Sequence, residues 1–336
     1  MVEFSDKTLR QIKKTCRGKK HLKLTVGYVT DNHSVIKIFN ENGELDPSIK
    51  CSYEIGSITK TFTASLLSKY VYENRLSLND SIQKYIEELE EDRYYPSLLR
   101  LATHRSGYSA TLPINKREYA KLILGLIRGG SDMNKNNPLN ADFNKMKTLI
   151  ETTKLKDADY SWKYSNFGMS IIGYVLGIVS GNGYWDTMND YIHGELGLTD
   201  TYLGTDKNNL HGYDRKNNDC GNWEWTKENL ISPAGALSST AEDLLEYAKI
   251  NMYEVKPYFP SCHEKHKKGI NKHDMGLGWM CLKKNNNIIF HGGATGSFSS
   301  FLAMDKEKKA ASVVLANYRL GMNNEEKIGF SLVDSL

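Results

Sequence analysis

The chain has 336 residues, of which 40% are hydrophobic and 25% charged, the composition of a globular protein long enough for a large core. Its 44 basic and 40 acidic residues leave a net charge of +4, which is too weak and too evenly mixed in sign to indicate a nucleic-acid partner. The five cysteines are scattered, odd in number and without C-x-x-C spacing, which favours reduced thiols over a disulfide framework.

The N-terminal part of the chain predicts one helix followed by strands. Residues 5–15 have amphipathic spacing, and Ser5 is suited to cap the start of that helix. Residues 21–30 and 33–40 predict the two strands of a β-hairpin, and Asn42–Gly43 marks the next turn.

From Thr59 to about residue 250 the pattern is mainly helical. Apolar residues recur at helical spacing in five segments: 61–73, 76–89 after a turn at Asn79–Asp80, 164–181, 183–197 and 236–251. Ser239 and Glu242 form a capping-box pattern at the start of the last of these helices. Residues 128–145 are polar and rich in glycine and asparagine, which predicts a loop or flap.

Strands return near the C-terminus. Residues 276–284, 286–293, 297–305 and 309–318 predict strands, and a final helix is expected at about 324–335. Because a lone hairpin is only marginally stable, strands from both chain ends must form one sheet, with the helical middle as an insertion. We therefore expect one lobe made of residues 1–56 and 240–336, a helical lobe of residues 57–239, and a site in the cleft between them.

No segment is typical of membrane insertion or secretion. The most apolar stretch, residues 169–180, is too short to cross a bilayer. The first twenty residues lack the apolar region of a signal peptide. We expect a soluble, cytoplasmic protein, or an extracytoplasmic one if a leader precedes this sequence.

The segment GSITKTFTASLL places Ser57 and Lys60 three residues apart, where an extended segment passes into a mostly apolar helix. These positions share a helix face, and the first turn of a helix favours developing negative charge. A lysine withdrawn from water has a lowered pKa and can accept the serine proton. The same spacing also arises by chance, at Ser34–Lys37 in a predicted strand and at Ser81–Lys84 in a polar helix, so two polar residues on an ordinary helix are the alternative.

A second candidate pair is Tyr164 and Asn166, just ahead of an apolar helix. Tyr164 could act as a tyrosinate base if a cation such as Lys60 lowered its pKa, and the Asn166 amide could bind a substrate amide. The same Y-x-N spacing occurs at Tyr72–Asn74 without a nearby nucleophile. A buried tyrosine beside a helix cap is the structural alternative.

The third candidate element is a strand that ends in His291, Gly292 and Gly293, followed by Ala294. Two glycines weaken a strand unless something must approach its backbone. Such a strand could pair with an extended substrate and present an amide N–H to its carbonyl oxygen, while His291 supplied a proton or a positive charge. A turn beside a structural histidine is the alternative.

In this order, the three elements resemble the serine β-lactamase and penicillin-binding-protein family, in its branch of class C β-lactamases, DD-carboxypeptidases and related esterases. Further segments are similar to the family in the same order, from about residue 20 to 320: LRLATHRSGY, GELGLTDTYLG, SPAGALSSTAEDL and MGLGW. The resemblance implies an α+β fold, with an antiparallel sheet flanked by helices as a β-lactamase/transpeptidase-like sandwich and an inserted all-helical lobe.

The resemblance also implies roles for the candidate residues. Ser57 would become acylated, Lys60 and Tyr164 would move the proton, and Asn166, His291, Gly292 and Gly293 would bind the substrate. The backbone N–H groups of Ser57 and Ala294 would form the oxyanion hole. Water would then release the acyl group.

The implied function is a serine hydrolase that acts on a small ester, an amide or a D-amino-acid peptide. A penicillin-binding DD-carboxypeptidase or a β-lactamase is the nearest alternative, and a non-catalytic ligand-binding member of the fold is the second. β-Lactamases typically carry Lys–Thr–Gly where this chain has His291–Gly292–Gly293, and the missing hydroxyl removes a usual partner of a β-lactam carboxylate. We expect a small-molecule or peptide substrate and no cofactor.

Two other chemistries find little support. The G-x-S-x-G pentapeptide of α/β-hydrolases does not occur. Cys262, His263, His266 and His273 lie close together in sequence, but their spacing matches no standard zinc site. The lysines around them predict a solvated loop, so we expect no metal there.

Overall fold

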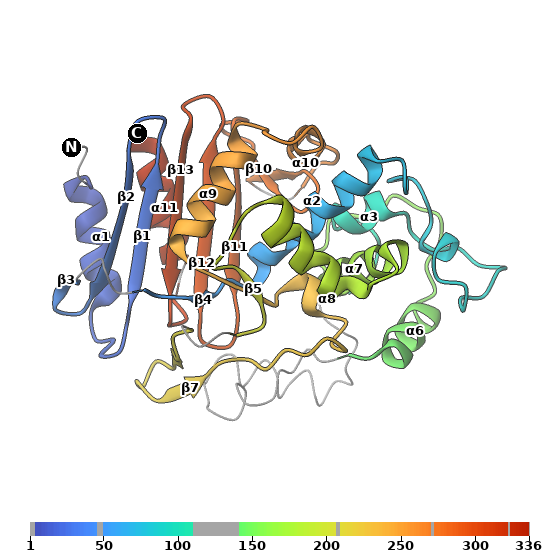
Figure 1. Cartoon of the computed structure of the whole chain (residues 1–336), viewed down its shortest axis with the longest axis horizontal. Helices are drawn as coiled ribbons and strands as arrows, with labels where there is room; N and C mark the ends of the chain where they lie inside the picture. The colour runs from blue at the N-terminus through green and yellow to red at the C-terminus, as the bar shows by residue number, and fades with distance from the viewer. Residues whose placement is uncertain are drawn as a thin grey trace.

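The computed structural model describes residues 4–45, 50–109, 141–205, 209–269, 272–321 and 323–335. Within these residues, eight strands form one antiparallel sheet in the order β3-β2-β1-β13-β12-β11-β10-β9 (Figure 1). The strands are β1 (Leu24–Val29), β2 (Ser34–Asn40), β3 (Gly43–Leu45), β9 (His273–Met275), β10 (Met280–Leu282), β11 (Ile288–Ala294), β12 (Ser299–Asp305) and β13 (Ala310–Ala316). The N-terminal hairpin joins the C-terminal strands where β1 pairs with β13, as the layout predicted.

Helices cover both faces of the sheet. α1 (Asp6–Cys16) and α11 (Asn324–Ser335) contact each other and close one face, where Phe301, Ala303 and Val314 point into their shared core. α9 (Ala241–Met252) lies across the other face, over β1, β12 and β13 (Figure 1). The predicted fold class, an antiparallel sheet flanked by helices, is therefore confirmed.

The segment between the two groups of strands holds most of the remaining helices. They are α2 (Thr59–Tyr72), α3 (Leu98–Ala102), α6 (Phe143–Thr152), α7 (Asn166–Ser180), α8 (Gly183–Asp190) and α10 (Phe259–His263). Short helical turns are η1 (Gly56–Ile58), η2 (Ile82–Lys84), η3 (Tyr191–Glu195) and η4 (Ser232–Ala234).

This inserted segment also carries strands, so it is not helical throughout. β4 (Tyr53–Glu54), β8 (Leu237–Ser239) and β5 (Tyr202–Leu203) form a small sheet, and β6 (Gly212–Tyr213) pairs with β7 (Asp219–Gly221). The division of the chain into lobes at residues 56 and 239 stays a prediction.

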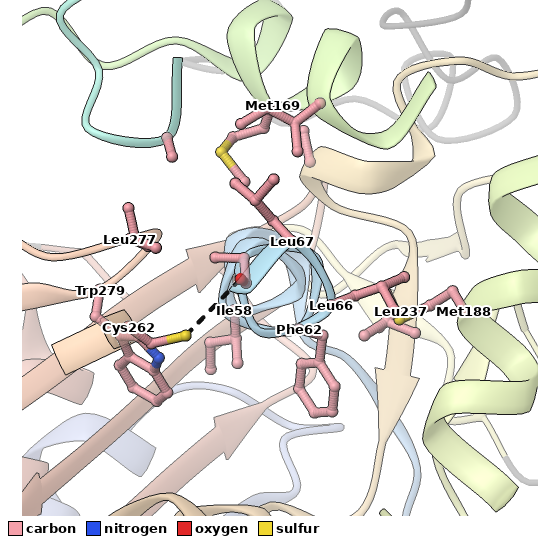
Figure 2. Close-up of a cluster of buried hydrophobic side chains, with 14 of the residues drawn as sticks. Ile58, Phe62, Leu66, Leu67, Met169, Met188, Leu237, Cys262, Leu277 and Trp279 are labelled. Atoms are coloured by element: carbon pink, nitrogen blue, oxygen red, sulfur yellow. Dashed lines mark hydrogen bonds between the residues drawn. The ribbon is translucent and has the colours of Figure 1, made fainter. Parts of the chain in front are cut away.

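Helix α2 is enclosed by the core on most of its surface. Figure 2 shows Ile58, Phe62, Leu66 and Leu67 around its axis, with Met169, Met188, Leu237, Cys262, Leu277 and Trp279 packed against them. Its buried hydroxyls donate to backbone carbonyls, as Thr63 does to Pro233 O at 2.8 Å and Ser68 to Tyr258 O at 2.7 Å. Such an enclosed helix gives the residues at its start a fixed position.

The predicted helix at 76–89 is wrong, and only the short turn η2 forms there. The Leu99 N–H donates to Leu78 O at 2.8 Å, and the Leu98 N–H donates to Asp80 O at 3.1 Å. These carbonyls are therefore taken by another segment and cannot accept the i→i+4 bonds of a helix. The apolar residues at helical spacing are still buried, as Ile82 and Ile86 show.

Three smaller predictions have mixed outcomes. The Ser5 hydroxyl accepts a hydrogen bond from the Thr8 N–H, so the predicted cap of α1 is confirmed. The cap of α9 is Thr240, which accepts from the Asp243 N–H, one residue beyond the predicted Ser239. Of the predicted flap at 128–145, residues 128–140 lie outside the described residues, and its last residues belong to α6.

All five cysteines are buried free thiols, in agreement with the expectation of reduced cysteines. Burial raises the pKa of the Cys16 and Cys281 thiols to about 11, and this keeps them protonated and unreactive at neutral pH. No helix within the described ranges is long and apolar enough to cross a bilayer.

Candidate active site

Ser57 lies in η1, between strand β4 and the start of α2. The chain enters this turn through Ile55, whose N–H donates to Leu237 O at 2.9 Å, and through Gly56, which has a left-handed φ of 50°. Ser57 is half-buried, while Ile55 and Ile58 on either side are fully buried. The passage from an extended segment into a buried helix is thus the one that the sequence predicted.

Lys60 directs its amine at Ser57. The Lys60 Nζ lies 2.8 Å from the Ser57 Oγ and donates to the Ala234 carbonyl at 2.6 Å. The lysine side chain is fully buried, and this burial lowers the pKa of Lys60 well below its ordinary value of 10.5. A neutral amine that donates one N–H to Ala234 O keeps its lone pair available for the proton of the Ser57 hydroxyl.

Tyr164 closes the third side of this group. Its ring centroid lies 4.9 Å from the Lys60 Nζ, and its hydroxyl shares a hydrogen bond with Ser57. Burial raises the pKa of Tyr164, and the bond with Ser57 opposes this only in part. The prediction of a tyrosinate is therefore wrong, because burial holds the pKa of Tyr164 above its ordinary value of 10 and Lys60 does not offset this. Tyr164 is a phenol that can pass a proton on.

His291 lies on β11 beside this group, and its ring centroid is 6.3 Å from that of Tyr164. Burial, followed by the proximity of Lys60, lowers the pKa of His291 to about 3. Its Nδ1 lies 2.6 Å from Gly292 O, to which a neutral imidazole donates. The prediction that His291 supplies a proton or a positive charge is therefore wrong at neutral pH, because the imidazole stays uncharged.

The strand edge beyond Phe290 has no neighbouring strand among the described residues, and its use by a substrate stays a prediction. β10 pairs only with Ile289 and Phe290, so in the part of the chain that the structure describes no strand pairs with that side of residues 291–294. Ala294, at the end of β11, is exposed.

Two glycines bring the end of β11 against η1. A Cβ on Gly56 would lie 2.6 Å from Ala294 N, and a Cβ on Gly293 would lie 2.0 Å from Ile55 O. Glycine at these two positions thus lets the Ser57 and Ala294 segments lie against each other. A Cβ on Gly292 would meet nothing closer than 3.7 Å, so the packing does not require glycine there.

Asn166 is the first residue of α7, two residues after Tyr164, and is half-buried. The preceding Ser165 caps α7, because its hydroxyl accepts from the Gly168 N–H at 2.9 Å. This cap fixes where α7 begins, and with it the positions of Tyr164 and Asn166 on either side of Ser165.

Two contributors to the site were missed by the sequence interpretation. The Ala234 carbonyl binds Lys60 through its backbone, which leaves no signal in the sequence. His104, within the segment LRLATHRSGY, is buried with its ring centroid 4.6 Å from that of Tyr164. The only signal in the sequence for a role of His104 was that it lies in a segment similar to the family.

The prediction of a solvated loop at 262–273 holds only in part, because Glu264, Lys265 and Lys268 are exposed whereas Cys262 and His263 are buried. Cys262 is fully buried, and His263 lies between Glu254 and Asn251 at 3.1 and 3.2 Å. His266 bonds Ser261 O through its Nε2. Among the residues that the structure describes, no three His, Cys, Asp or Glu side chains gather to hold a metal ion.

A family model described as Beta-lactamase matches residues 52–330. A β-lactamase of Providencia stuartii is 28% identical over 218 residues, which cover 63% of this chain and 50% of that protein. The chain spans about half the length of the curated relatives it matches.

Two solved structures show the same fold at low identity. A class C β-lactamase has a TM-score of 0.79 and 21% identity, with 98% of this chain and 96% of that chain covered. A β-lactamase/D-alanine carboxypeptidase from Pseudomonas syringae has a TM-score of 0.78 and 16% identity, with 98% of each chain covered. The resemblance found in the sequence is therefore confirmed, and the chain belongs to the serine β-lactamase and penicillin-binding-protein family.

Proposed function

We propose that this protein is a serine hydrolase that works through an acyl-enzyme on Ser57. The observation that carries the proposal is the 2.8 Å contact between the Ser57 hydroxyl and a buried Lys60 amine whose pKa is lowered well below 10.5. A serine hydroxyl is a weak nucleophile until a base takes its proton. A neutral amine at hydrogen-bond distance is such a base.

The proposed reaction begins when the Ser57 Oγ attacks the carbonyl carbon of the substrate and Lys60 takes the hydroxyl proton. The Tyr164 phenol gives its proton to the leaving group and is restored by the proton that Lys60 holds. The N–H groups of Ser57 and Ala294 stabilise the oxyanion. Water then attacks the acyl carbon, the bond to Ser57 Oγ breaks as the same groups pass the proton of the water to that oxygen, and the acid product leaves.

The proposed substrate is a small ester, an amide or a D-amino-acid peptide. The Asn166 amide would bind the substrate amide, and the open edge of β11 at His291–Gly293 would accept an extended segment. A DD-carboxypeptidase or a β-lactamase is the second candidate, favoured by the names of the Providencia and Pseudomonas relatives. Gly292 argues against the β-lactamase, since it offers no hydroxyl to a β-lactam carboxylate.

The Ser57→Ala variant tests the nucleophile. We expect it to lose hydrolysis of p-nitrophenyl acetate and butyrate by more than about 10³-fold and to take up no labelled penicillin, because the covalent bond forms at Ser57 Oγ. Ser34→Ala is the matched control, since it removes the exposed serine of another S-x-x-K pair and should leave the rates unchanged. Equal labelling of Ser57→Ala and wild type would refute the assignment. A wild-type chain without turnover of any ester, lactam or D-alanyl amide would favour a ligand-binding protein.

The pH profile tests the base. Protonation removes the lone pair of Lys60, so kcat/KM for a p-nitrophenyl ester should rise from acid pH as the amine becomes free, and the rise should be complete well below pH 10.5 because burial lowers the pKa of Lys60. His291 does not contribute to this rise, because its pKa of about 3 leaves it neutral throughout. The raised pKa of Tyr164 puts its ionisation above pH 10, so no loss is expected up to that pH. Activity that begins to rise only near pH 10.5, where an ordinary lysine loses its proton, would show that the base is wrongly assigned.

A further inference from the structure

His104 contacts the backbone on both sides of Tyr164. The Lys163 N–H donates to the His104 carbonyl at 2.8 Å, and the Ser165 N–H donates to its Nδ1 at 3.3 Å. The His104 ring also lies against the Tyr164 ring, with centroids 4.6 Å apart. One buried residue thus binds the backbone N–H groups of the residues before and after Tyr164, and its ring packs on the phenol itself.

The backbone of His104 is unusual. Helix α3 ends at Ala102, and His104 follows in the left-handed region with a φ of 57°. Glycine is the common residue at this place after a helix, and any other residue except asparagine or aspartate bears a cost of about 1 kcal/mol or more. The conformation lets one residue present its carbonyl to Lys163 and its ring to Ser165.

The hydrogen bond from Ser165 requires an unprotonated Nδ1. Burial, and then the nearby Lys60, His291 and His273, lower the pKa of His104 well below 6.5. The ring is therefore neutral at the pH where the enzyme would act, and its proton lies on Nε2. In the part of the chain that the structure describes, Nε2 has no hydrogen-bond partner.

We infer that His104 is a positioning residue that holds the Tyr164 hydroxyl on Ser57 through the backbone of residues 163 and 165. The inference rests on the proposed function, because it concerns the proton transfer that Tyr164 performs there. The place of Tyr164 before α7 fixes its backbone but not its ring. The contacts of His104 fix the ring as well. A displacement of about 1 Å at a reacting group costs about 100-fold in rate.

The test uses the full chain and a fluorophosphonate, whose phosphorus bonds to the Ser57 Oγ while fluoride leaves. His104→Gly removes the ring and its acceptor but permits the left-handed backbone. We expect the rate constant of labelling to fall about 100-fold with little change in the apparent dissociation constant of the probe. His104→Asn should restore the rate to within about threefold, because asparagine tolerates this backbone and its Oδ1 can accept from Ser165.

Circular dichroism and thermal melting would establish that each variant is folded. If His104→Gly does not fold, the labelling rate of His104→Asn still decides the test. Rescue by asparagine together with loss in the glycine variant supports the positioning role. A glycine variant labelled at the wild-type rate, or an asparagine variant as slow as the glycine one, overturns it. A wild type that is not labelled at Ser57 overturns the proposed function and this inference together, whereas a labelled wild type with unchanged variants overturns the inference alone.

Discussion

Replacing Lys60 by methionine is expected to slow the acylation of Ser57 by about 10²- to 10⁴-fold, the range that a positioned base contributes. Methionine fills a similar volume but has no lone pair that could take the serine proton at 2.8 Å. The measurement is the rate of fluorophosphonate labelling at pH 8, with p-nitrophenyl acetate hydrolysis as a second readout. Retention of more than a tenth of the wild-type rate would mean that another group removes the proton.

The matched control is Lys69→Met, the same substitution further along α2. Lys69 pairs with Glu73 and Glu195 near the surface, so the labelling rate should be unchanged.

A stability measurement isolates the contribution of the buried Lys60 amine. Because the folded chain lowers the pKa of Lys60, the unfolded chain binds more protons between that lowered value and 10.5, and the free energy of unfolding rises with pH there. The difference between wild type and Lys60→Met in urea unfolding should show this rise, and Lys69→Met should not remove it.

The sequence was sufficient to identify the residues that meet at Ser57, because each carries its own spacing signal. Ser57 and Lys60 are three apart at a helix start, and Tyr164 stands just before a strongly apolar helix. The structure brings these side chains together through α2 and α7, two helices that pack on each other. The other S-x-x-K pairs lack such an enclosed helix, as Ser34 in the exposed start of β2 shows.

The protonation states could not be predicted in the same way, since they depend on burial by segments far apart in the chain. The pKa of Lys60 is lowered because η4 and Tyr164 help to bury its amine, and the pKa of His291 is lowered first of all by its own burial. From the sequence, Lys60 was either a base with a lowered pKa or a cation that could help to ionise Tyr164. The lowered pKa of Lys60 and the raised pKa of Tyr164 favour the first of these.

Local pattern also failed where distant backbone competed for hydrogen bonds. The helical spacing at 76–89 correctly marks buried positions, but Leu98 and Leu99 take the carbonyls that a helix would need.

The glycine pair on β11 was interpreted as room for a substrate. At Gly293 the structure gives a second reason, because the chain's own Ile55 and Ser300 occupy that space.

Gly293→Ala is therefore expected to damage both stability and acylation. Its Cβ would lie 2.0 Å from Ile55 O and 2.3 Å from Ser300 Oγ, atoms that also bond each other at 2.7 Å. Overpacking of this kind costs about 1–3 kcal/mol or more in the free energy of unfolding. We expect the clash with the Ile55 carbonyl to move the end of β11 and η1 apart, which increases the distance between the Ala294 N–H and Ser57. Loss of one oxyanion donor costs about 10²- to 10³-fold in rate.

Urea unfolding and the labelling rate would be measured on Gly293→Ala, and unfolding alone on Gly292→Ala as its matched control. The added Cβ of Gly292→Ala meets its nearest neighbour, Glu326 Oε1, at 3.7 Å, an ordinary contact, so its unfolding free energy should stay within about 0.5 kcal/mol of wild type. Equal stability losses in the two variants would show that any alanine at the end of strand β11 is unfavourable. A collision with η1 would then not be the cause of the loss. If Gly293→Ala lost stability but kept the full labelling rate, the expected link between the packing of β11 on η1 and the acylation rate would be refuted.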